Sequence, residues 1–341
     1  MKSNYRYIVK AFMAMAVIAG TTSCDDFLDR EPMSSISPET YYSTAAQLEA
    51  NLNDEYPNVL PSFGQWTYGI FGEDKGTDNQ IEVNANDRYT QDRWKVPHSE
   101  SDNWKFERIY RINFFLSEAL PKFGEDMIGS QNTISGSVAT IKHYIGEMYF
   151  LRAYEYFKKL QLFGDFPIIN QPLADEMEAL REASKRFPRN EVARFIISDL
   201  DKAYAYMSDV DMATTRINKD AAMLVKSRVA LFEATWLQNF KGTAFVPGGE
   251  GWPGASLHNN YQYPSGNIDN EVKYFLEQAV EASKLVADKY KGSLTENTGV
   301  LQQSADDPSN PYFDMFAQED LSDVKEVLLW RQYARGLSTH N

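Results

Sequence analysis

Cysteine is almost absent from the 341-residue sequence, in which Cys24 is the single one. One cysteine cannot build an internal disulfide framework, so the sequence does not belong to the small disulfide-stabilised secreted domains. Positive charge is also scarce, since 34 Lys and Arg face 48 Asp and Glu and the formal net charge is −14. A surface that binds nucleic acid needs clustered Lys and Arg, so we expect no nucleic-acid partner.

Patterns that carry catalysis or metal binding are missing as well. The four histidines lie far apart, and none has the spacing of metal ligands. There is no nucleophile elbow, phosphate loop or dinucleotide fingerprint. The acidic stretch Gly72–Glu82 has the composition of a calcium loop, but its spacing favours an acidic turn. We therefore expect no catalytic residue, no metal and no cofactor, although a carboxylate pair for glycoside hydrolysis stays open among the 48 acidic residues.

The apolar run near the N-terminus is short. It covers residues 11–20, about half the length that a membrane-spanning helix needs, and follows three basic residues. Residues 1–23 are therefore predicted to be a signal peptide. Because small residues lead directly into Cys24, the segment resembles a bacterial lipoprotein signal, although Thr21 stands where the common pattern has Leu. This resemblance implies that Cys24 becomes the acylated first residue and anchors the chain to a membrane; the alternative is a free thiol after an ordinary secretory signal.

Helical periodicity dominates the rest of the chain. Apolar residues recur at steps of three and four and predict amphipathic helices over residues 44–59, 103–120, 190–207, 218–240 and 271–290. Asn190 and Asn218 are expected to cap two of them. Residues 140–163 are apolar around most of the helix circumference, which is typical of a central helix. Gly164 and Pro167 are expected to end it.

The way small and bulky residues combine points to one fold class. Ala230 and Ala234 are expected to pack against aromatic side chains of other helices, as in tetratricopeptide-like α-solenoids. We predict an all-α, tetratricopeptide-like helical scaffold with long irregular loops and few short strands. The best strand signal is Lys325–Ala334. The long loops 61–103 and 241–267 are rich in aromatic residues, and loops of such length usually carry function or are disordered.

Several motifs resemble one family, the RagB/SusD (starch-utilisation-system D-like) nutrient-uptake lipoproteins of Bacteroidetes. They are "CDDFLDREP" after the signal and "GEMYFLRAYEYFKKLQLFGDFPII" at residues 146–169. Weaker matches follow in the family order, to about residue 335. The resemblance implies a SusD-like fold and a non-catalytic lipoprotein on the outer face of the outer membrane, with Asp25 and Asp26 as the signal for surface export. It implies binding of a glycan or other polymeric nutrient, which passes to a SusC-like TonB-dependent transporter.

The resemblance also directs attention to the aromatic loops. Sugar rings stack their C–H faces on Trp and Tyr, while their hydroxyls need polar partners at the rim. The residues expected to bind ligand are therefore Trp66, Arg88, Trp94, Trp252, Tyr261 and Tyr263, with Asn84 and Asn86 at the rim. Packing within the protein is the alternative for each aromatic residue. Glu147, Arg152 and Asp165 of the long motif are expected to be structural, as a buried ion pair and a helix exit.

The sequence departs from the family in length. Family members continue well beyond the segment at 325–334, so residues 24–341 are expected to form the N-terminal and central part of a SusD-like domain that lacks the C-terminal region. Whether this is a fragment or a short member stays open. Two other functions also stay open: a helical scaffold that holds a transporter or partner without binding sugar, and a surface hydrolase.

Overall fold

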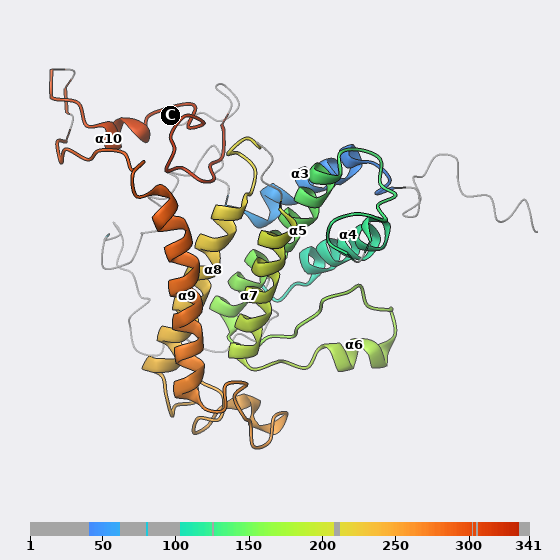
Figure 1. Cartoon of the computed structure of the whole chain (residues 1–341). Helices are drawn as coiled ribbons and strands as arrows, with labels where there is room; N and C mark the ends of the chain where they lie inside the picture. Colours follow the sequence, from blue (N-terminus) through green and yellow to red (C-terminus); the bar gives the residue numbers. More distant parts are fainter. Residues whose placement is uncertain are drawn as a thin grey trace, which may run out of the picture.

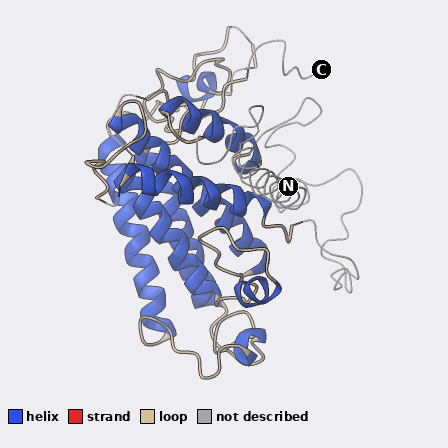
Figure 2. Cartoon of the chain, turned by 90° about the vertical axis from the view of Figure 1, so that its right-hand side faces the viewer, coloured by secondary structure: helices blue, strands red, loops and turns tan. Residues whose placement is uncertain are grey.

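The computed structural model describes residues 41–61, 80, 103–124, 126–207, 212–301, 303–304 and 306–333. Cys24 and the predicted binding residues Trp66, Asn84, Asn86, Arg88 and Trp94 lie outside this part of the chain. Within it, the secondary structure is helical, with isolated bridges at Thr44–Ser135 and Phe166–Phe187 (Figure 2). The all-α prediction is confirmed, whereas the few short strands are not found among the described residues.

The long helices pack mostly on helices that are close to them in the sequence. The elements are α3 (Ala45–Val59), α4 (Glu107–Phe123), α5 (Val138–Phe163), α6 (Met177–Ala183), α7 (Arg189–Tyr206), α8 (Lys219–Asn239), η3 (Pro253–Ser256), α9 (Ile268–Tyr290) and α10 (Pro311–Met315). Helix α5 contacts α3, α4 and α7, while α7 packs on α8 and α8 on α9. Figure 1 shows α9, α8, α7 and α5 side by side. Successive packing of neighbours is the arrangement expected of a tetratricopeptide-like scaffold.

Helix α5 lies at the centre, as its apolar circumference predicts. Most of its residues between Ile141 and Leu160 are buried, and they pack against helices on several sides. Gly146 allows α7 to come close, because a Cβ atom there would lie 2.7 Å from Met207 Cγ and 2.9 Å from the Ala203 carbonyl oxygen. The helix ends at Gly164, whose φ of 67° suits glycine and whose N–H donates to the Leu160 carbonyl.

Of the two expected helix caps, Asn218 is right and Asn190 is wrong. Asn218 caps α8 and accepts a hydrogen bond from the Ala221 N–H, as expected. Asn190 is not a cap, because α7 already begins at Arg189. It is buried, and its amide donates to Glu271 of α9 instead. Helix α9 begins at Ile268, three residues earlier than predicted, because the Asn267 side chain caps it.

The strand prediction at Lys325–Ala334 is wrong for the described part of that segment. Residues 325–333 form turns and irregular chain, since no described strand runs beside them. Helix and loop groups take up backbone bonds instead. The Asn218 side chain donates to the Leu328 carbonyl, and the Trp330 N–H donates to the Thr214 carbonyl. Leu328 and Leu329 pack against the core of the helices, so the apolar run at 327–330 reflects this packing and not strand pairing.

The two ends of the helical stack carry different features. The chain between α8 and α9, residues 240–267, lies at the lower end in Figure 1, where these helices meet. Helix α10 and the segment that follows lie at the upper end (Figure 1). Among the described residues, no helix is long and apolar enough to cross a bilayer.

Candidate ligand-binding site

Three of the predicted binding residues gather in one cluster at the lower end of the stack. The Trp252 and Tyr261 rings have centroids 5.6 Å apart, and the Tyr261 and Tyr263 centroids are 5.2 Å apart. His258 completes the cluster, with its ring stacked 5.9 Å from that of Trp252. We call these four residues the aromatic cluster. The sequence placed them in one loop, and the structure brings their rings into contact.

The polar groups of the aromatic cluster form hydrogen bonds to other segments and within the loop. The Trp252 Nε1–H donates to Asp165 Oδ2 at 2.7 Å, and the Tyr263 hydroxyl donates to the Pro247 carbonyl at 2.6 Å. The Tyr261 hydroxyl lies 2.9–3.1 Å from the amide group of Asn190. Burial raises the pKa of both tyrosine hydroxyls well above the ordinary value, so they stay neutral. The bonds to Asp165 and Asn190 fix the loop to α7 and to the chain just after α5, and the bond to Pro247 closes the loop on itself.

Trp252 is enclosed on the side of η3. Its side chain is 5% exposed, and Gly254 lies directly against its ring. A Cβ atom at Gly254 would fall 2.2 Å from Trp252 Cζ2, so the close approach requires glycine. Trp252 therefore supports the loop. Whether its remaining exposed edge, or either tyrosine, contacts a ligand stays a prediction.

A depression of about 500 Å³ lies beside Trp252, and we call it the loop depression. Its walls come from four segments that are distant in sequence. They are residues 161–165 at and just after the end of α5, Arg186 and Arg189 just before and at the start of α7, Trp236 of α8, and the loop residues 244–245, 252–254 and 257. A cavity of this size is within the usual range for small-molecule sites, about 300–1,000 Å³.

Charged groups in the walls of the loop depression are mostly paired. Arg189 forms a buried bidentate ion pair with Glu233 at 2.9–3.2 Å and lies 4.0 Å from the Trp236 ring centroid. Asp165 accepts from the Arg189 N–H and from Trp252, while burial raises the pKa of its carboxyl group. Arg186 is exposed and stacks its guanidinium 4.6 Å over the Trp104 ring, without an ion pair to a described residue.

Sequence reasoning missed the most exposed aromatic ring in this region. Phe245 is 61% exposed and lines the loop depression. It lies in a short apolar triplet, Ala244–Val246, within an irregular loop, so neither periodicity nor a motif marks it. Arg186 was missed for the same reason. Only the position of both residues near the end of α5 shows their relation, and that position depends on the tertiary fold.

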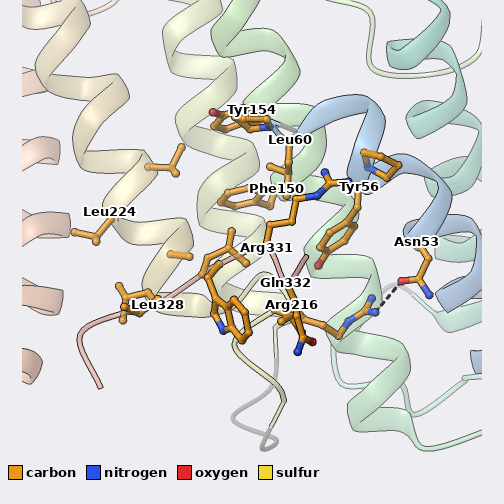
Figure 3. Close-up of a pocket in the computed structure, with 18 of the residues that line it drawn as sticks. Asn53, Tyr56, Leu60, Phe150, Tyr154, Arg216, Leu224, Leu328, Arg331 and Gln332 are labelled. Atoms are coloured by element: carbon orange, nitrogen blue, oxygen red, sulfur yellow. Dashed lines mark hydrogen bonds between the residues drawn. The ribbon is translucent and has the colours of Figure 1, made fainter. Parts of the chain in front are cut away.

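A larger groove of about 920 Å³ lies between α3, α5, α8 and the segment 326–332. Figure 3 shows Tyr56, Phe150, Tyr154 and Leu224 around it, with Leu328 and Gln332 from the C-terminal segment. Much of the lining is aliphatic or aromatic. Two of its polar groups have partners: the Tyr56 hydroxyl donates to Glu147, and the Trp330 indole N–H donates to the Thr214 hydroxyl. The exposed side chains of Arg331 and Gln332 form no hydrogen bond to a described residue, so the free polar groups of the groove lie at one segment.

Glu147 and Arg152, expected as a buried ion pair, each pair with a different residue. Glu147 accepts two hydrogen bonds from Arg216, at 2.7 and 2.9 Å, and lies 3.1 Å from His143 Nε2. Arg152 binds both oxygens of Asp199 at 2.6 and 2.8 Å. All of these partners except Arg216 are almost fully buried. The pairs join α5 to its neighbours, and the described residues contain no metal-binding cluster of His, Cys, Asp or Glu.

Comparison with known protein families assigns the chain to one of them. A family profile described as "Starch-binding associating with outer membrane" (SusD-like_3) matches residues 26–231, more than half of the sequence. The chain belongs to this SusD-like family. The motif at residues 146–169, from which the resemblance was first drawn, lies inside the matched region.

Two SusD-like proteins of Formosa agariphila and a solved structure from Bacteroides fragilis are similar to this chain. SusD-like protein P25 of Formosa agariphila is 26% identical over 233 residues, which cover 63% of this chain and 41% of that protein. SusD-like protein P2 of the same species is 25% identical over 253 residues, with 71% and 46% covered. A SusD-like protein from Bacteroides fragilis has a solved structure with 21% identity and a TM-score of 0.43, covering 62% and 39%. The chain thus spans less than half the length of these relatives.

Proposed function

We propose that this protein is a non-catalytic, surface-facing outer-membrane lipoprotein that binds glycan nutrients and passes them to a SusC-like TonB-dependent transporter. The match to the SusD-like family carries the proposal, because the family is described as starch-binding and associated with the outer membrane. The lipoprotein-like signal that ends at Cys24 supports a lipid anchor.

The predicted glycan contacts are the loop residues. Trp252, Tyr261 and Tyr263 belong to an ordered aromatic cluster beside a depression, and Trp66, Arg88 and Trp94 are proposed to add to the binding surface from the other long loop. Aromatic rings bury large apolar areas against a partner at little entropic cost, which suits the C–H faces of sugar rings. Hydrogen-bonding groups near the rings would then select the sugar.

The first test is affinity electrophoresis of the full chain, extracted in detergent, through gels that contain soluble polysaccharides. A panel of α-glucan, β-glucan, mannan and uronic-acid polymers covers the main chemical classes. We expect one or more neutral polysaccharides to retard the protein, while a protein of similar size without sugar affinity runs unchanged. If no polysaccharide retards it, sugar is not the ligand.

Anchoring is tested separately with Cys24→Ala. Wild-type protein is expected in the outer-membrane fraction with an intact mass that includes acyl chains. The variant is expected to lack those chains and to leave the membrane fraction. A wild-type mass without acyl chains would contradict the lipoprotein assignment and leave glycan binding unaffected.

A second candidate function is a helical scaffold that holds the transporter or another partner without binding sugar. The large groove favours it, because its lining is mostly apolar, as expected of a surface that packs against another protein. Co-purification from membranes distinguishes the two functions. A transporter recovered equally with wild type and with Trp252→Ala, together with no glycan binding by the wild type, would favour the scaffold.

A further inference from the structure

We propose that the loop depression binds one uncharged sugar unit, with Phe245 as the surface on which the ring stacks. The inference rests on the proposed glycan-binding function and adds which face of the molecule holds the sugar, through which groups, and of which charge class. It also shifts the central contact from the enclosed Trp252 to a residue that the sequence did not mark.

Phe245 has the properties of a preformed stacking surface. Its ring is 61% exposed, which is unusual for a large aromatic residue on an ordered loop. Its backbone is held, since its carbonyl accepts the Trp236 Nε1–H at 3.0 Å and its N–H donates to Thr243 Oγ1 at 3.3 Å. The ring itself meets Phe240 edge to face at 5.4 Å. A ring held in this way loses little freedom when a ligand covers it.

Residues that line the same depression carry hydrogen-bonding groups without partners among the described residues. The last hydrogen bond of α5 runs from the Gly164 N–H to the Leu160 carbonyl, so the carbonyls of residues 161–163 lie beyond it. No described residue donates to these three carbonyls. The exposed amide of Gln161 and the guanidinium of Arg186 also lack hydrogen-bond partners among the described residues. Acceptors and donors are therefore both available, as the hydroxyls of a sugar require.

The charge of the walls favours an uncharged ligand. The end of α5 is the negative end of a helix dipole, and Asp165 adds a carboxylate close to it. Arg189 is neutralised by Glu233. Arg186 is the wall cation in the described residues without an ionic partner, and the carboxylate of Asp165 offsets its charge. A carboxylate on the sugar would therefore gain no net attraction from the walls and would be repelled by the helix end, whereas a neutral hexose carries no charge to repel.

The large groove lacks this combination. It has a greater volume and two exposed polar side chains, Arg331 and Gln332, but its aromatic rings are covered. Phe150 is buried, and Tyr56, Tyr154 and Trp330 are only partly exposed, so no ring in the groove is as open to a sugar face as Phe245. The loop depression is thus the better sugar site of the two.

The experiment is isothermal titration of the full chain with short neutral oligosaccharides from the polysaccharide that retards it most. Phe245→Ala is expected to weaken binding about tenfold or more, and Phe245→Tyr is expected to restore it. Phe316→Ala is the matched control, since Phe316 is a 69% exposed ring near α10 at the other end of the stack, and it is expected to bind as the wild type does. Thermal unfolding of each variant checks the fold.

Two further measurements test the proposal. Hydrogen exchange with and without sugar is expected to slow in residues 241–257, and a uronic-acid oligosaccharide of equal length is expected to bind more weakly than the neutral one. If the wild type binds sugar and Phe245→Ala binds equally well, the depression is not the site, while the proposed function stands. If the uronic acid binds more tightly, the charge argument is wrong. If the wild type binds no sugar at all, both proposals fail.

Discussion

Several buried polar residues of the helical stack form ion pairs or hydrogen bonds with residues far away in the sequence. Glu147, Arg152 and Asp165 could be recognised as motif residues, but their partners Arg216, Asp199 and Trp252 are 69, 47 and 87 positions away. No local pattern encodes such a distance. The chemistry of a buried carboxylate or guanidinium only predicts that some partner exists, because an unpaired buried charge is too costly.

Removal of one partner of the pair between Glu147 and Arg216 is the first residue-scale prediction. Arg216→Met leaves the fully buried Glu147 without its two charged hydrogen bonds, and we expect a loss of about 3–5 kcal/mol in the free energy of unfolding. Urea denaturation measures it. Lys284→Ala, which breaks the exposed pair with Asp288, is the control and should change little. Equal losses in the free energy of unfolding of both variants would show that burial of the ion pair does not determine the loss.

Alkaline pH gives the second residue-scale prediction. Burial raises the pKa of Tyr42 from 10.0 to about 12, and the Asn51 side chain donates to its hydroxyl. The neutral phenol therefore stabilises the fold fully below pH 10, and this contribution is lost as the pH rises toward 12. Urea denaturation at about pH 9 and about pH 12 should show the loss.

Tyr42→Phe identifies the source of that loss. The variant should lose less stability between the two pH values than the wild type does, because it has no phenol to ionise. Tyr110→Phe, at a half-exposed ring, serves as the control and should follow the wild type. A Tyr42→Phe variant with an undiminished loss would assign the alkaline effect to other groups.

Whole elements were predicted more reliably than single contacts. The central helix α5 and its end at Gly164 follow from composition and one glycine, and the other long helices follow from apolar periodicity. The short helices α6 and α10 were missed, because five to seven residues are too few to show a period. The predicted strand failed because a short apolar run does not by itself define a strand, and a turn-rich segment packed on helices also needs apolar residues.

The approach of α5 to α7 is the element-scale prediction. Alanine normally favours a helix over glycine by about 1 kcal/mol. At Gly146, however, the new methyl would press on Met207 and the Ala203 carbonyl, so Gly146→Ala is expected to destabilise the fold by about 1–3 kcal/mol. Thermal and urea unfolding measure the change. Gly292→Ala is the control, because a Cβ there meets no atom within 4 Å, and a Gly146→Ala variant as stable as this control would contradict the packing.

At the scale of the whole molecule, the sequence pointed to the family and to one of the loops at which the helical stack ends. The fold class and the SusD-like family followed from motifs spread along the chain, and the family match confirms them. The loop depression could not be predicted, since its walls come from the end of α5, the start of α7, α8 and the loop. Only packing of α7 on α5 and α8 brings these segments together.

Binding without cleavage is the central claim, and one measurement tests it most directly. The full chain is titrated calorimetrically with a neutral polysaccharide, and the glycan recovered from the same sample is then sized by chromatography. We predict saturable heat and an unchanged chain length of the glycan. A shortened glycan, or no heat with any polysaccharide of the panel, would contradict the account.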